Sequence, residues 1–86
     1  MKVIFRKFKQ GNDIIAFFPE QYGFPNCNKY MMMSYMHIGQ HGEADYEGCV
    51  MVSKLAKPEE YADLLSELKR IYHDETITVV KRFQRN

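Results

Sequence analysis

An amphipathic helix is the feature that most limits how these 86 residues can fold. The segment "KPEEYADLLSELKRIYH", residues 57–73, opens with Pro58 and two glutamates, which suit the first turn of a helix. Its apolar residues recur with the helical period and form one stripe: Tyr61, Leu64, Leu65, Leu68, Ile71 and Tyr72. A single helix cannot bury such a stripe by itself. The helix of about 58–72 must therefore pack on one face of a sheet.

The start of the chain predicts a β-hairpin. Residues 2–9 and 13–18 are rich in β-branched and aromatic side chains. Gly11-Asn12 between them suits a two-residue turn. Such a turn sets the register of the hairpin so that Phe8 pairs with Ile15. Pro19 cannot donate to a strand ladder, so the second strand should end there, before a loop over residues 19–28.

Two further strands are expected at residues 29–38 and 76–83. For residues 39–57 a strand at "CVMV" and a helical turn over 46–52, capped by Asp45, both remain open, and the helical turn is preferred. The order is then β-β-β-α-β. Short, right-handed connections give the strand order 3-2-1-4, with the last strand parallel to the first. We expect a single α+β domain over residues 1–86. It is a two-layer sandwich in which one main helix covers a small mixed, mostly antiparallel sheet.

Charge and cysteine content place the chain among water-soluble proteins. The net charge of +1 hides basic ends and an acidic middle, since nine of the 11 acidic residues fall within residues 37–75. The uncharged runs are too short to span a bilayer, and the start does not resemble a secretory signal. Cys27 and Cys49 are therefore expected to be reduced thiols of a cytoplasmic protein.

Four segments carry a resemblance: "VIFRKF", "IIAFFPE", "SYMHIGQHGEADY" and "KPEEYADLLSELKRI". In these segments the chain resembles a group of small bacterial, phage and plasmid proteins of uncharacterised activity. The resemblance covers most of the chain and implies a phage or mobile-element origin, but no particular activity. The chain departs from the group at Phe17, where leucine is usual, and in its run of three methionines.

The stretch "YMHIGQHGEADY", residues 35–46, brings together residues that ligate metals. His37, His41, Glu43 and Asp45 are chemically adequate for zinc or manganese. The glycines at 39 and 42 argue against the helix that a paired-histidine zinc motif needs. We expect instead that Gly39 and Gly42 make a turn and that the polar groups satisfy it.

Catalysis is not expected. Cys27 or Cys49 can be combined on paper with His37 or His41, but no spacing supports a nucleophile and base. A domain of this size also has little room for a pocket that excludes water. We therefore predict no catalytic residue, no resident metal and no cofactor.

Nucleic-acid binding is one alternative function. If the first and last strands are neighbours, a basic surface forms from Arg6, Lys7, Lys9, Lys81, Arg82 and Arg85. Phenylalanines interleaved with them would stack on bases if they were exposed. The pI of about 7.8 is low for such a domain, and the phenylalanines also suit a core.

A small protein-interaction module is the preferred function. The hairpin is apolar on both faces, with Ile4, Phe8, Ile15 and Phe17 on one and Val3, Phe5, Ile14 and Phe18 on the other. One helix covers one face, so the loops at 19–28 and 39–57, a second copy of the chain or a protein partner must cover the other. Adaptable apolar contacts are predicted from Met31, Met33, Tyr35 and Phe17. For a phage protein, a host protein is the natural partner, and the acidic middle suits a basic one.

Overall fold

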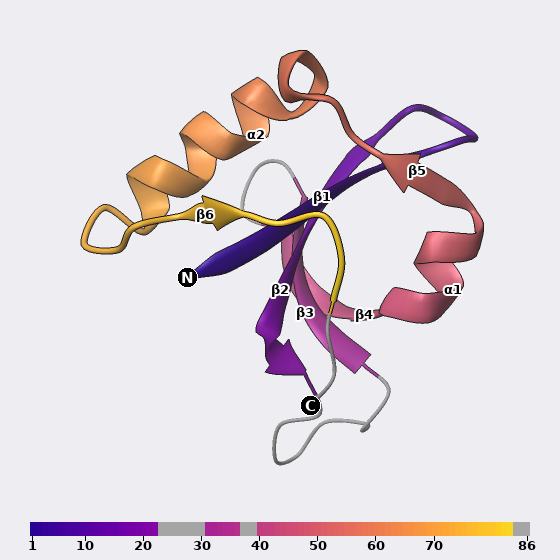
Figure 1. The fold of residues 1–86 in the computed structure, drawn as a ribbon, viewed down its shortest axis with the longest axis horizontal. Helices are drawn as coiled ribbons and strands as arrows, with labels where there is room; N and C mark the ends of the chain where they lie inside the picture. Colours follow the sequence, from indigo (N-terminus) through magenta and orange to yellow (C-terminus); the bar gives the residue numbers. More distant parts are fainter. Residues whose placement is uncertain (23–30, 37–39, 84–86) are drawn as a thin grey trace.

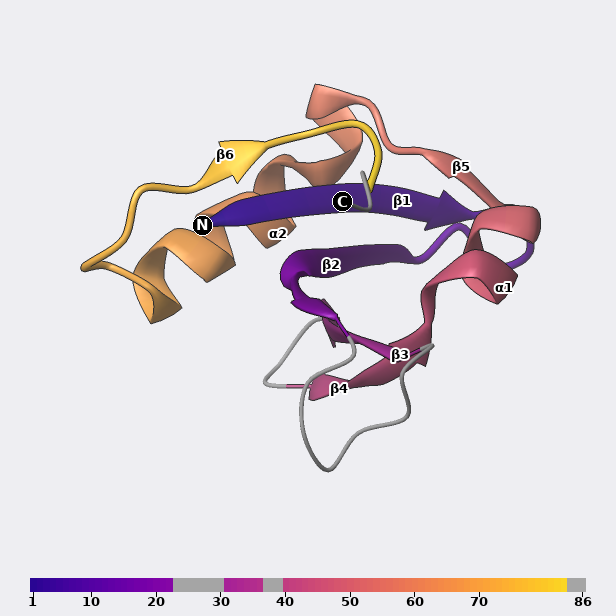
Figure 2. The same ribbon diagram turned by 60° about the horizontal axis from the view of Figure 1, so that its bottom comes forward.

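A six-stranded sheet forms the centre of the computed structural model, which describes residues 1–22, 31–36 and 40–83. The elements in chain order are β1 (Lys2–Phe8), β2 (Ile14–Tyr22), β3 (Met31–Met36), β4 (Gln40–Asp45), α1 (Tyr46–Met51), β5 (Ser53–Leu55), α2 (Pro58–Ile71) and β6 (Thr78–Val79). The strand order is β4-β3-β2-β1-β5, and β6 also pairs with β1. Figures 1 and 2 show how the sheet curls between β1 and β4. The predicted α+β class is therefore confirmed, as is the order of the four expected strands.

The outer edge of β1 is shared by two short strands. Its first two residues pair in parallel with β6, and its last three pair antiparallel with β5. Between these pairings the carbonyl of Val3 accepts from the amide of Val80 at 2.9 Å, and that of Phe5 from the amide of Ala56 at 3.1 Å. Val3 and Phe5 are alternate residues of β1, and alternate residues of a strand present their backbone groups to the same edge. The segments that contain Val80 and Ala56 are therefore bonded to the same edge of β1. The strand predicted for 76–83 is therefore only two residues long.

The hairpin forms, but its predicted register is wrong by two residues. Lys7 pairs with Ile14, and the amide of Phe8 donates to the carbonyl of Asp13 at 2.9 Å, which closes a loop of four residues, 9–12. Within this loop Gly11 and Asn12 both have positive φ, 89° and 61°. A shift of two keeps each side chain on its predicted face, because the strand period is two. The predicted end at Pro19 is also wrong, since β2 continues to Tyr22. Next to Pro19, the side-chain carboxylate of Glu20 accepts a hydrogen bond of 2.8 Å from the backbone amide of Lys2.

Helix α2 covers one face of the sheet, as predicted. Leu64 and Leu68 are buried against a cluster that joins three strands: Val3, Phe5, Ala16, Phe18 and Tyr35. Tyr61 stacks on Phe5, with ring centroids 4.4 Å apart. Lys57 is the N-cap residue and Pro58 lies in the first turn. Within the described residues, no helix is both long and apolar enough to cross a membrane.

The opposite face is covered by the chain itself. Ile4, Ile15, Phe17 and Met32 are at most 4% exposed. They lie under Tyr46 of α1 and under the segment after β6, from which Val80 and Phe83 pack on the same cluster. Tyr46 lies edge-on to both Phe17 and Phe83, at centroid distances of 5.1 and 6.0 Å. Of the predicted alternatives, part of the segment 39–57 covers this face, together with the C-terminal segment, which was not among them.

Strand β4 corrects the interpretation of residues 39–45 as a turn. Gly42 lies in the middle of β4, opposite Ser34, whose hydroxyl donates to the Gly42 carbonyl at 2.8 Å. Its φ is not positive, and a Cβ added there would meet no atom within 4 Å. Gly39 lies outside the described residues. The preferred helical turn at 46–52 is confirmed as α1, whose N-cap Asp45 accepts from the Gly48 amide at 3.2 Å.

Candidate functional site

The predicted metal ligands are only partly described. His37 lies outside the described residues, and His41, Glu43 and Asp45 hold alternate positions in β4. The carboxylate of Asp45 is occupied as the cap of α1. Among the described residues, no three His, Cys, Asp or Glu side chains are grouped to hold a metal ion. A metal site here would use side chains that lie outside the part of the chain that the structure describes, so it stays a prediction.

The described cysteine is not an activated nucleophile. Cys49 is half-buried in α1, and burial, followed by the nearby charge of Asp45, raises the pKa of its thiol. A nucleophilic cysteine needs the opposite shift, because the thiolate is the reactive form. Cys27 lies outside the described residues. The geometry around Cys49 therefore gives no support to cysteine chemistry.

Of the six predicted nucleic-acid contacts, the structure describes five, which separate into two bonded side chains and three exposed ones. Arg6 donates to Ser53 through Nε and Nη2, at 2.7 and 2.9 Å, and Lys7 pairs with Glu60. Arg85 lies outside the described residues. The side chains of Lys9, Lys81 and Arg82 are exposed.

The aromatic residues expected to stack on bases are not at the surface. Phe5 and Phe17 are 2% and 0% exposed, and Phe8 and Phe83 are half-buried. Phosphate contacts remain open to the exposed cations, whereas the buried rings of Phe5 and Phe17 are not accessible for base stacking.

The predicted partner contacts fall mainly inside the molecule. Tyr35 and Phe17 are 1% and 0% exposed, so they are core residues and cannot meet a partner without opening the fold. Met33 is half-buried against the α2 side of the sheet, and Met31 is half-buried at the start of β3. A partner surface must therefore be sought elsewhere.

The corner between α1 and β5 is fixed by a polar network. Arg6 donates to both the hydroxyl and the carbonyl of Ser53, and that hydroxyl donates to the carbonyl of Cys49. Ser53 is 4% exposed, so these bonds are shielded from water. The amide of Lys9 donates to the carbonyl of Val52 at 3.1 Å and ties the corner to the end of β1. The backbone at 49–53 is thus held at both ends.

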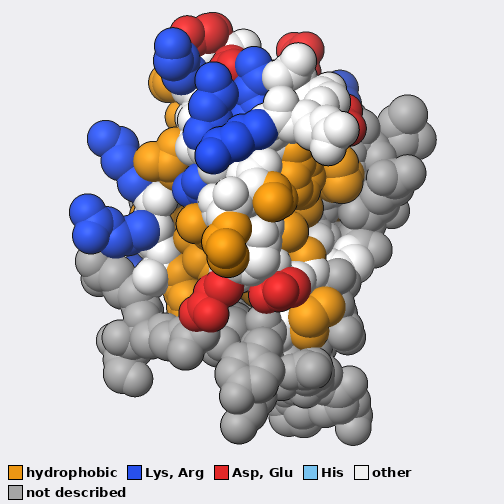
Figure 3. Space-filling model, turned by 90° about the vertical axis from the view of Figure 1, so that its right-hand side faces the viewer, with side chains coloured by type: hydrophobic (Ala, Val, Ile, Leu, Met, Phe, Trp, Pro, Cys, Tyr) orange, Lys and Arg blue, Asp and Glu red, His pale blue; other side chains and the backbone are white. Residues whose placement is uncertain are grey.

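This corner turns apolar side chains outward. Met51 is 80% exposed, Val52 55% and Leu55 41%. We call these three residues the apolar patch. Figure 3 views this side of the molecule and shows hydrophobic side chains gathered at its centre, with Lys and Arg side chains above and to the left. Met51 and Val52 are neighbours in the chain, and exposed apolar residues that adjoin one another are typical of contact surfaces.

Basic side chains border the apolar patch. Lys9 adjoins Val52 through its backbone bond, Lys54 lies within β5, and Lys81 lines the same pocket as Leu55. All three lysines are exposed. Lys9 and Lys81 are among the contact residues predicted from the sequence, whereas Met51, Val52 and Leu55 are not. "CVMV" has the composition of a core segment, and only the fixed corner places two of its residues outside.

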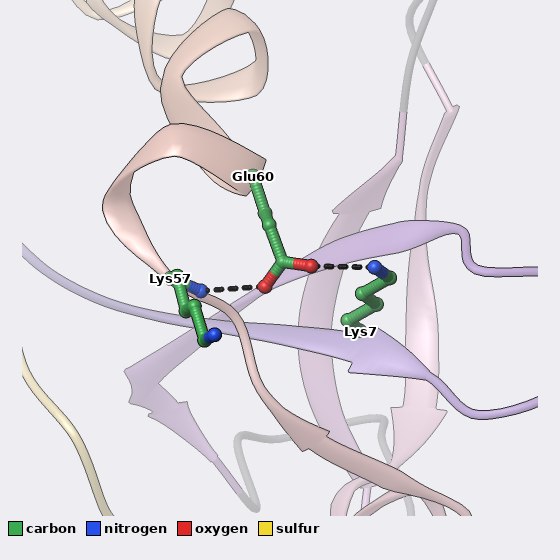
Figure 4. A network of polar contacts seen from close by, with 3 residues as sticks. All are labelled: Lys7, Lys57 and Glu60. Atoms are coloured by element: carbon green, nitrogen blue, oxygen red, sulfur yellow. Dashed lines mark hydrogen bonds and ion pairs between the residues drawn. The ribbon is translucent and has the colours of Figure 1, made fainter.

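A second polar network fixes the start of α2. Glu60 accepts from the backbone amide of Lys57 at 2.9 Å and from Nζ of Lys7 at 2.5 Å, which links the helix to β1. The hydrogen bond from Lys7, followed by that from Lys57, lowers the pKa of the Glu60 carboxyl. Figure 4 shows the Lys57 side chain extending away from Glu60. Its ammonium group is therefore not part of this network.

Comparison with known proteins gives no relative: no protein-family model, curated protein or solved structure matches the chain.

Proposed function

We propose that this chain is a small non-enzymatic protein-interaction module that binds through the apolar patch and its basic border. The observation that carries the proposal is the exposure of Met51 and Val52 at a corner whose backbone is held by partly buried hydrogen bonds. A rigid apolar surface loses little conformational entropy on binding. In a chain that resembles phage and plasmid proteins, a host protein is the natural class of partner.

The chemistry of the border defines the partner. Lys9, Lys54 and Lys81 lie along part of the border of the apolar patch, and Figure 3 shows the Lys and Arg side chains above and to the left of the hydrophobic ones and Asp and Glu side chains below them. On the basic side of the border, a complementary segment carries acidic groups beside apolar ones. A second copy of the chain is less suitable in a symmetric contact, because the same lysines would face each other. The occupant we propose is an acidic amphipathic segment of another protein, and not the basic partner that the acidic middle of the sequence suggests.

Selection from a displayed library of random peptides tests this proposal. Peptides enriched on the immobilised protein should combine Asp or Glu with large apolar residues, and their binding should be lost in Met51→Asp. Ile71→Asp is the matched control, because it introduces the same charge at an exposed apolar residue of α2, outside the apolar patch. Peptides without acidic residues, or equal binding by both variants, would refute the proposal.

Nucleic-acid binding is a second candidate, supported by one observation. The pairing of β6 with β1 brings the basic C-terminal segment beside the first strand, as the alternative required. Exposed Lys9, Lys81 and Arg82 are available to phosphates. Labelled single- and double-stranded DNA and RNA at low salt test it. Binding should fall steeply with salt and disappear in Lys9→Glu with Arg82→Glu, and the absence of binding to all four probes would remove this candidate.

A further inference from the structure

A pocket opens where the two short strands leave β1. Its volume is about 360 Å³, within the range of about 300–1,000 Å³ that holds small ligands. One wall follows Leu55 into the start of α2, and the other follows Val79 to Lys81. The backbone bonds from Ala56 to Phe5 and from Val80 to Val3 fix both walls on the same edge of β1. The pocket is therefore built by the fold and not by loose surface side chains.

The interior of the pocket is apolar and aromatic. Phe5 and Tyr61 stack with an interplanar angle of 10°, and both line it. Leu55 and Val79 line it as well and are 41% and 38% exposed. These two side chains remain partly in water, so an apolar ligand gains free energy by covering them.

The charge of the pocket is positive. Lys57 and Lys81 belong to opposite walls, and among the described residues that line the pocket none is acidic. Of the two first-turn carboxylates of α2, that of Glu60 is bonded to Lys7 and to the Lys57 backbone. A cavity that is lined by two lysines and by no acidic residue favours an anionic ligand.

From this geometry we infer that the pocket binds a small amphiphilic anion, with its apolar body over Phe5 and Tyr61 and its carboxylate between Lys57 and Lys81. A medium-chain fatty acid is the simplest member of this class. The site goes beyond the proposed protein contact, because it adds a cavity, the stacked rings of Phe5 and Tyr61 and the charge of Lys57, while Leu55 and Lys81 are common to both. Nothing in the inference depends on the acidic peptide.

Titration of the isotopically labelled protein with decanoate, followed by NMR, tests the inference. Saturable shifts are expected at Phe5, Tyr61 and Val79. Lys57→Gln with Lys81→Gln should weaken decanoate about tenfold, equivalent to about 1.4 kcal/mol. Lys69→Gln with Arg70→Gln is the matched control, because it removes the same charge from the exposed far end of α2 and should leave the affinity unchanged.

Decanol separates the two parts of the interaction. It has the same apolar body without the charge, so it should bind more weakly than decanoate and equally to the wild type and to the Lys57/Lys81 variant. All four substituted residues are exposed, so a preserved amide spectrum is expected and shows that the fold is intact. Decanoate shifts outside the pocket, or equal decanoate affinity in both double variants, would overturn the inference.

Discussion

Replacement of Leu68 by alanine measures how strongly α2 is held on the sheet. Leu68 is 0% exposed and belongs to the same buried cluster as Phe5 and Phe18. Loss of a buried leucine costs about 2–5 kcal/mol, because the removed groups lose their contacts and leave a cavity. Domains of this kind have a total stability of about 5–15 kcal/mol. At about 4–8 °C per kcal/mol, the melting temperature should fall by at least about 8 °C.

Urea denaturation followed by circular dichroism gives the free energy directly. Leu55→Ala is the matched control, since it removes the same atoms from a side chain that is 41% exposed in β5. Its midpoint should move much less than that of Leu68→Ala, with an unchanged slope for both. Equal shifts for the two variants would show that the apolar stripe of α2 is not the core of the domain.

Three other changes have defined outcomes. Asp45→Ala should lower the free energy of unfolding by about 0.5–2 kcal/mol through loss of the α1 cap, while Asp45→Asn retains most of it; equal losses in urea denaturation would show that the cap contributes nothing. Gly42→Ala should leave the melting temperature unchanged or raise it, because an added Cβ meets no atom there. Gly11→Ala should lower the melting temperature, because φ at this residue is 89°. A lower melting temperature for Gly42→Ala than for Gly11→Ala would contradict the backbone conformation of these two glycines. The lowered pKa of Glu60 stabilises the fold above the pKa of an unfolded glutamate, and this stabilisation disappears as the pH falls through the folded pKa. Glu60→Gln should therefore be less stable than wild type at neutral pH and converge with it in acid, and a difference independent of pH would refute the pairing with Lys7.

The sequence predicts the hairpin faces better than the hairpin register. Alternation of side chains places Val3 and Ile4 on opposite faces of the hairpin. A change of register by an even number of residues leaves the β1 and β2 residues that share each face unchanged. The four-residue loop depends on positive φ at both Gly11 and Asn12, and the same pair also suits a two-residue turn. Local pattern therefore determines the faces, whereas the backbone conformation of the loop determines the register.

Strand β4 was missed because its composition is that of a loop. "QHGEAD" contains no β-branched or aromatic residue, and Gly42 lies at its centre. Pairing with β3 over six residue pairs makes it a strand, since β-propensity depends strongly on the neighbouring strand. The same dependence on tertiary structure explains the apolar patch, whose exposure results from the corner at Ser53 and not from the hydropathy of the segment.

The cover of the second sheet face could be predicted only in outline. The sequence shows that Ile4, Ile15 and Phe17 need cover, and residues 39–57 were among the candidates to supply it. The contribution of Val80 and Phe83 was missed, because residues 76–83 were expected to continue as a strand. Only the early end of β6 frees this segment to cross to the opposite face.

NMR of the isotopically labelled protein with a bound acidic peptide locates the partner surface directly. The peptide should perturb Met51, Val52 and Leu55 and leave the buried residues Phe17 and Met32 unshifted, because the chain already covers its own sheet. Intermolecular contacts to Phe17 or Met32 would contradict this prediction, since they would show that the partner replaces α1 and the C-terminal segment on the open sheet face.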